Sequence, residues 1–204
     1  MLISMPNKNL LLVLMEPPAS LEEEFNDWYD TEHFPQRKGL PGFESASRWV
    51  CIDGWPRWLA LYDLESANTL RTPEYLAVSG SNSTPWSKRI LPRTIGRCRV
   101  DACQVVPGDA LTINAREIAR LLLIRFPGVA PADRARITKQ MNAVFEATAG
   151  MTQLRLFEAA SEDGNDVYVL VAFDRPFLLD TLLPAIAQTG RVDLVNCYVP
   201  YRRG

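Results

Sequence analysis

The chain has little of what metal sites are made from. It contains a single histidine, His33, and its cysteines, Cys51, Cys98, Cys103 and Cys197, form no C-x-x-C pair. A zinc site of the usual Cys/His type needs several such ligands at close spacing, so we expect none. Scattered thiols inside apolar runs are typical of small buried hydrophobes in a reducing compartment.

The sequence also lacks a long apolar run and a long basic run. The run from Leu10 to Met15 is too short to span a membrane, and Pro17-Pro18 follows it. A signal peptide would need a longer apolar region and a small-residue cleavage site. Lys and Arg number 22 against 24 Asp and Glu, and they are not clustered. We therefore expect a cytoplasmic protein that binds neither membranes nor nucleic acid.

What the sequence does contain is one series of elements in the same order twice. An apolar run that ends at proline precedes a helix-like segment, a glycine and two further strand-like runs, and then a second helix-like stretch. The strand-like runs, in chain order, are 10–17, 43–52, 57–65, 120–127, 151–160 and 166–174. The last strand of each half is predicted to open with the same triplet, Arg99-Val100-Asp101 and Arg191-Val192-Asp193.

Each half therefore has the order β-α-β-β-α-β, which is the split βαβ or ferredoxin-like arrangement. We predict an α+β fold with two tandem ferredoxin-like repeats packed as an intrachain dimeric α/β barrel. The repeats are expected at 1–106 and 115–204, with a linker at 107–114. Strands that are apolar on both faces suit two sheets packed face to face, and the space between the sheets is the expected ligand cavity. Such sheets often pair through outer edges and helices, so a homodimer is also expected.

The residues that carry chemistry are concentrated in the first half. His33 and all five tryptophans lie there, whereas the second half has neither residue type. We therefore predict that the first half, 1–106, holds the site and that the second half is a structural cover.

The first helix carries an apolar stripe that leads to the histidine. Its members at helical spacing are Leu21, Phe25, Trp28 and Tyr29. The next positions on this stripe are Glu32 and His33, where a carboxylate beside the only imidazole breaks the apolar pattern. Pro35 is predicted to end the helix, and Asp30 is predicted to face solvent.

The segment W-Y-D-T-E-H-F-P-x-x-x-x-L-P-G-F, from Trp28 to Phe43, resembles the helix-to-strand signature of EthD-like proteins in the dimeric α/β barrel superfamily. The resemblance implies a ferredoxin-like barrel, which such proteins usually form from two chains rather than one. Relatives include cofactor-free oxygenases, polyketide cyclases, decarboxylases and isomerases, as well as haem-binding branches. The second half of the chain lacks the histidine motif.

His33 and Glu32 are the predicted catalytic residues. The unperturbed pKa of histidine lies near neutrality, which suits general acid–base work, and Glu32 would orient the imidazole. The alternative is that His33 caps a helix end, where a protonated imidazole contributes about 0.3–1 kcal/mol.

The predicted substrate-binding residues are an arginine and four aromatics. Arg48 could clamp a carboxylate or phenolate, or it could pair with a buried acid such as Glu32. The aromatic candidates are Tyr29, Trp58, Tyr62 and Trp86, which could line a pocket for a flat ligand or simply belong to the core. Arg89, Arg93 and Arg97 are interpreted as a solvated face, with a gate for an anionic ligand as the alternative.

Two hypotheses for function follow, with a third behind them. The first is an enzyme without metal or organic cofactor, in which His33 moves a proton on a small aromatic or polyketide-like acid. Its reaction would be a cyclisation, decarboxylation, isomerisation or oxygenation. The second is a non-catalytic ligand-binding or stress-type barrel. The third is a haem-binding barrel, which would depend on His33 as the axial ligand.

Overall fold

The computed structural model describes residues 8–106, 111–112, 114–162 and 164–203, so the predicted linker at 107–114 lies mostly outside the described residues. Eight strands form a closed barrel in the order β1-β3-β2-β8-β5-β7-β6-β4, and neighbouring strands are antiparallel. The strands are β1 (Asn9–Glu16), β2 (Phe43–Asp53), β3 (Trp58–Leu64), β4 (Ile95–Gln104), β5 (Arg120–Val129), β6 (Met151–Ser161), β7 (Gly164–Phe173) and β8 (Leu194–Pro200).

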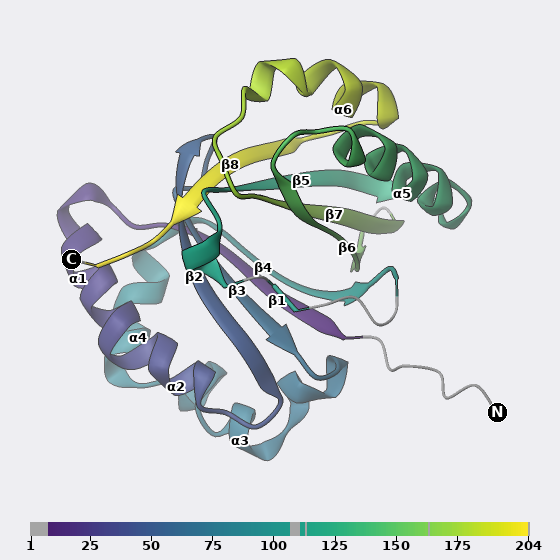
Figure 1. Ribbon diagram of the computed structural model, residues 1–204. Coiled ribbons are helices and arrows are strands. Elements are labelled where there is room, and N and C mark those ends of the chain that lie inside the picture. Colours follow the sequence, from purple (N-terminus) through teal and green to yellow (C-terminus); the bar gives the residue numbers. More distant parts are fainter. Residues whose placement is uncertain (1–7, 107–110, 113, 163, 204) are drawn as a thin grey trace.

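Helices cover the barrel on two opposite sides (Figure 1). Helices α1 to α4 lie against the strands of the first half, and α5 and α6 lie against those of the second. Their bounds are α1 (Glu22–Trp28), α2 (Phe34–Lys38), α3 (Pro73–Leu76), α4 (Pro85–Ile90), α5 (Pro131–Glu146) and α6 (Leu183–Thr189). No helix in the described ranges has the length and apolar character that crossing a bilayer requires. The fold is thus an α+β, eight-stranded antiparallel barrel.

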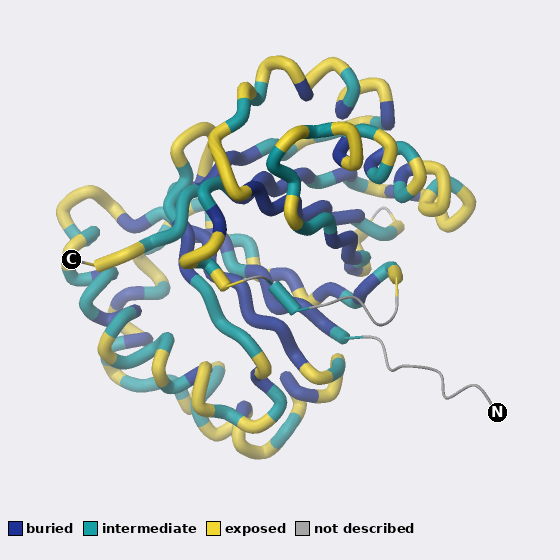
Figure 2. Tube along the Cα trace, viewed as in Figure 1, coloured by how far each residue is buried: buried dark blue, intermediate teal, exposed yellow. Residues whose placement is uncertain are grey.

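Strands β1, β3, β5 and β7 are buried on both faces along most of their length, which explains their continuous apolar sequence (Figure 2). On β1, Leu10, Leu12 and Leu14 pack inside the barrel, whereas Leu11 and Met15 pack under the helices. An amphipathic strand would leave one of these faces to solvent.

The barrel interior is a packed core rather than the expected cavity between two sheets. Trp49, Phe157 and Tyr198, from strands of both halves, are each 0% exposed inside it. The prediction of a ligand cavity there was wrong, because large side chains from both halves interdigitate and fill the space.

The two halves of the barrel are joined along short ladders. Strand β2 pairs with β8 at Trp49–Asp53, and β4 pairs with β6 at Cys103 and Gln104. The triplet Arg99-Val100-Asp101 lies inside β4, but Arg191-Val192-Asp193 precedes β8. The prediction that both triplets open a strand was therefore wrong, because the triplets occupy different positions relative to their strands.

Candidate functional site

His33 is positioned by a π-helical turn, η2 (Tyr29–His33), which lies between α1 and α2. The Phe34 N–H donates to the Tyr29 carbonyl across this wider turn. Pro35 lies in the first turn of α2, where a missing N–H is tolerated, and the helix runs on to Lys38. The prediction that Pro35 ends the helix was therefore wrong.

The π turn also holds Asp30, which was predicted to face solvent. Asp30 accepts hydrogen bonds from the Arg48 guanidinium and, at 2.9 Å, from the Tyr201 hydroxyl. The prediction was wrong because Arg48 reaches Asp30 from β2, and the Asp30 side chain is only 22% exposed. His33 and Tyr29 still face the barrel, and Tyr29 is 2% exposed.

Arg48 is enclosed by aromatic rings and by polar acceptors. Its Cζ lies 4.2 Å from the Tyr29 ring and 4.3 Å from the Tyr201 ring, and it donates to Asn26 Oδ1 at 2.7 Å. With Asp30 it forms an ion pair in which the Arg48 side chain is 5% exposed. The structure thus shows the pairing with an acid, although the acid is Asp30 rather than Glu32.

Glu32 belongs to a separate hydrogen-bond network. Its carboxylate accepts from the Thr84 hydroxyl, and Thr84 is the N-cap of α4 and accepts from the Ser87 N–H. No hydrogen bond among the described residues joins Glu32 to His33, and His33 Nδ1 is buried without a partner. The role of Glu32 in orienting the imidazole remains a prediction.

His33 lines a cavity of about 350 Å³ between the strands and their helical cover. The outer faces of β1, β3 and β4 form one wall, and α2, α3 and the segment after α3 form the other. The apolar floor consists of Leu11, Val13 and Met15 of β1. The larger polar side chains are His33, Arg37, Tyr62, Tyr75, Arg97 and Arg99.

The imidazole of His33 is held neutral. Its ring packs 4.5 Å from the Trp28 ring and 5.2 Å from the Tyr29 ring. Burial disfavours the charged imidazolium, and together with the positive charges of Arg37 and other arginines it lowers the pKa of His33 from 6.5 to about 3. A neutral residue in a helix that continues to Lys38 does not act as a protonated helix-end cap.

Two tyrosine hydroxyls lie in the same region and interact with each other. The hydroxyls of Tyr29 and Tyr62 are buried without a hydrogen-bond partner of good geometry, as is the Trp58 indole N–H. Burial raises the pKa of Tyr29 and of Tyr62, so both remain protonated donors. Buried donors without acceptors are costly, and several together mark a place that suits a polar ligand atom.

Of the predicted substrate-binding residues, only Tyr62 lines the cavity itself. Tyr29 and Trp58 lie behind it around Arg48, where the Trp58 ring is 5.1 Å from the guanidinium carbon. Trp86 packs beside the core under the helices, and its indole donates to Glu24 at 3.1 Å.

The sequence reasoning missed Arg37, Tyr75 and Arg99, and it placed Arg97 on a solvated face. Arg37 lies four residues after His33, on the same helix face, so helical spacing could have indicated it. Arg97 and Arg99 alternate on β4 and therefore share one face of that strand. Arg97 is exposed and also lines the cavity.

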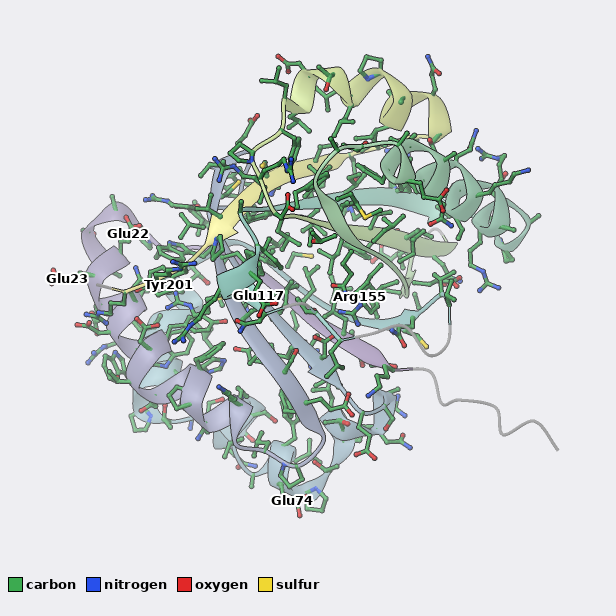
Figure 3. All side chains as sticks on the ribbon, viewed as in Figure 1. Glu22, Glu23, Glu74, Glu117, Arg155 and Tyr201 are labelled. Atoms are coloured by element: carbon green, nitrogen blue, oxygen red, sulfur yellow. The ribbon has the colours of Figure 1, made fainter. Side chains whose placement is uncertain are left out.

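A larger groove of about 810 Å³ lies elsewhere, over the edge of β2 beside the C-terminal residues. Figure 3 labels Tyr201 at this place, next to α1. The groove lacks His33, and ion pairs already engage its Arg48 and Arg203. Among the described residues, no group of three or more His, Cys, Asp or Glu side chains is arranged to hold a metal ion.

Comparison with known proteins gives the fold. No family model matches the sequence, and no curated protein has a similar sequence. Among solved structures, an anthrone oxidase-like protein superposes with a TM-score of 0.62 at 10% identity, over 96% of this chain and 92% of that one. A candidate monooxygenase from Lactobacillus acidophilus NCFM gives 0.55 at 14% identity, over 95% and 94% of the two chains. A candidate chlorite dismutase gives 0.60 at 8% identity, over 97% and 96%.

The present chain shares the fold of these structures over nearly its whole length.

Proposed function

We propose that this chain is a cofactor-independent enzyme of the EthD-like type, in which His33 transfers a proton on a small aromatic or polyketide-like acid. The observation that carries the proposal is His33 itself. It is a half-buried, neutral imidazole whose Nδ1 is buried without a partner, and it lines a cavity with an apolar floor. A neutral imidazole is the form that can accept a proton.

The surroundings of His33 support proton transfer to or from a ligand rather than a structural role. A proton taken from a ligand C–H or O–H leaves an anion beside the new imidazolium, and the two charges attract in a site of low dielectric. The hydroxyl of Tyr62, which burial keeps protonated, could donate to the developing oxyanion. Cyclisation, decarboxylation, isomerisation and oxygenation can each begin with such a step.

The tandem architecture is part of the proposal. The strand orders β4-β1-β3-β2 and β8-β5-β7-β6 follow the same pattern in the two parts of the barrel, which supports two ferredoxin-like repeats. We propose repeats at 1–106 and 115–204, of which the first carries the site. The superposed structures named as oxidase-like and monooxygenase-like support an enzyme of this general type.

Proton abstraction can be tested without knowing the natural substrate. Phenylpyruvate is a small aromatic keto acid whose C3 protons exchange with solvent through the enol. In D2O, the parent protein should accelerate deuterium incorporation at C3, as followed by NMR, and His33→Gln should remove this acceleration. Lys139→Gln on α5, outside the first half, is the matched control and should behave as the parent.

The main alternative is a non-catalytic barrel that binds the same class of ligand. In that case, phenylpyruvate would bind with similar affinity to the parent and to His33→Gln, and neither protein would accelerate exchange. Binding without acceleration across a series of keto and phenolic acids would overturn the enzymatic proposal.

The residues around His33 do not fit a haem ligand. Its ring is packed between Trp28 and Tyr29, and the cavity of about 350 Å³ is at the small end for ligand sites. A porphyrin needs a wide, flat space beside its axial imidazole, and these neighbours occupy that space. Addition of haem should therefore give no visible absorption band that depends on His33.

A further inference from the structure

The arginines at the His33 cavity form no ion pair with a carboxylate of the described residues. Arg37, Arg97 and Arg99 line the cavity, and no lining residue is Asp or Glu. By contrast, Arg89 pairs with Glu24 and Arg125 pairs with Asp193. The cavity therefore carries positive charge that no acid of its wall balances.

The buried member of the three is Arg37, which is 5% exposed. Its Nη2 donates to the Val78 carbonyl at 2.8 Å, whereas its Nη1 is buried without a partner. A buried guanidinium with an unsatisfied N–H and no counterion is costly. An anion in the cavity would supply both the missing acceptor and the missing charge.

Tyr75 connects Arg37 with the strand arginines. The Arg37 Cζ lies 5.2 Å from the centre of the Tyr75 ring, and the Tyr75 hydroxyl accepts from Arg99 Nη2 at 3.3 Å. Arg97 is two residues from Arg99 on the same face of β4, and it makes no hydrogen bond or ion pair with any described residue. Arg37 and Arg99 thus both contact Tyr75, and Arg97 lines the same cavity with its guanidinium free to take a ligand.

We propose that Arg37, Arg97 and Arg99 form an anion clamp that binds the carboxylate of a small ring-containing acid, whose ring lies on Leu11, Val13 and Met15. The clamp deepens the proposed function, because it takes the same cavity as the ligand site. Guanidinium groups match the planar carboxylate with paired N–H donors. The far end of the ligand then faces His33 and Tyr62, and a hydroxyl or keto oxygen there meets the unpartnered polar atoms.

The clamp also gives the anion a role beyond affinity. The charges of Arg37 and Arg97, two members of the clamp, also disfavour a proton on His33. A bound carboxylate offsets them, so His33 becomes a better base when the ligand is present.

The test compares two probes that differ in charge. Salicylate carries a carboxylate at pH 7, and salicylamide is its neutral analogue. Calorimetric titration should show that the parent binds salicylate at least tenfold more tightly. Arg97→Gln should weaken salicylate binding about tenfold, or about 1.4 kcal/mol, and leave salicylamide binding unchanged. Arg97 is exposed, so this variant should fold.

Arg89→Gln is the matched control. Arg89 lies on α4, shortly before Arg97 in the chain, but it pairs with Glu24 and does not line the cavity. The control variant should bind both probes as the parent does. Equal affinity of the parent for the two probes, or unchanged salicylate affinity in both Arg97→Gln and Arg99→Gln, would overturn the clamp. So would the absence of saturable binding of either probe to the parent. None of these results touches the phenylpyruvate exchange assay, which decides the proposed function separately.

Discussion

The Arg155 guanidinium on β6, labelled in Figure 3, lies 2.6 Å from the Asp63 carboxylate on β3, and this ion pair joins strands of the two halves of the barrel. The side chains are 2% and 0% exposed. Thr112 contacts both partners: its hydroxyl accepts from Arg155 at 2.7 Å and its N–H donates to Asp63 at 3.0 Å. Thr112, which lies between the two halves in the sequence, therefore bridges the pair.

Removing one charge of this pair should destabilise the protein strongly. Asp63→Asn leaves the Arg155 charge buried without a counterion, so we expect the free energy of unfolding to fall by about 3–5 kcal/mol. The double variant Asp63→Leu/Arg155→Met should recover most of this loss, because no buried charge remains. Urea denaturation measures both effects. Arg134→Gln, which breaks a largely exposed pair with Glu158, should cost less than about 1 kcal/mol.

The free energy of unfolding should decrease as the pH is lowered, because of His33. The pKa of His33 is about 3 in the folded chain and 6.5 when unperturbed, so the unfolded state binds the extra proton between these values. The free energy of unfolding should therefore decrease as pH falls from 6.5, by about 1.4 kcal/mol per unit. His33→Gln should lack this component, and since the chain has one histidine, the difference between parent and variant isolates it. Equal pH slopes of parent and variant would contradict the lowered pKa of His33.

Arg48 should prove necessary for stability and should not tolerate lysine. The guanidinium contacts Asp30 and Asn26 at the same time and lies over the rings of Tyr29 and Tyr201. A lysine ammonium cannot reproduce this planar arrangement, so Arg48→Lys should lower the free energy of unfolding by about 1–3 kcal/mol. Arg202 nearby makes only a 3.4 Å contact with the Arg116 carbonyl, so Arg202→Gln should leave the stability unchanged. Thermal unfolding of the two variants and the parent measures both effects.

Gly96 should resist substitution for two separable reasons. Its φ is +56°, and a Cβ there would lie 2.0 Å from the Trp55 ring. Gly80 has a φ of +57° and open space around its Cβ position. Gly80→Ala therefore measures the backbone cost alone, about 1 kcal/mol. Gly96→Ala should cost clearly more, and Trp55→Ala in the same chain should bring its cost down to that of Gly80→Ala.

Much of the fold could be predicted because the strands are recognisable from their local sequence. The apolar runs near β1 and β5 and the hairpin glycines lie within a few residues of the observed strand ends. The position of the cavity could not be predicted in the same way. The sequence of a strand that is apolar on both faces does not indicate which face packs against the other half and which packs against helices.

The candidate site was predicted in part for a similar reason. His33 was identifiable as the only imidazole on an apolar stripe, and Tyr62 from its strand. Arg97 and Arg99 reach the cavity from β4, more than sixty residues later in the chain. Their meeting with Arg37 depends on the strand order of the barrel, and no local pattern in the sequence reports that order.

The π turn at Tyr29–His33 makes the site depend on chain length as well as on residue identity. It acts as a phase shift: the helix before it and the helix after it are out of step by one residue. A chain shortened by one residue here, for example without the exposed Thr31, could wind as an unbroken α-helix. Different residues of this helix would then face the barrel, although no residue of the site would have been replaced. Single-residue deletions in this turn are thus a route by which relatives of this chain could gain or lose the site without a substitution.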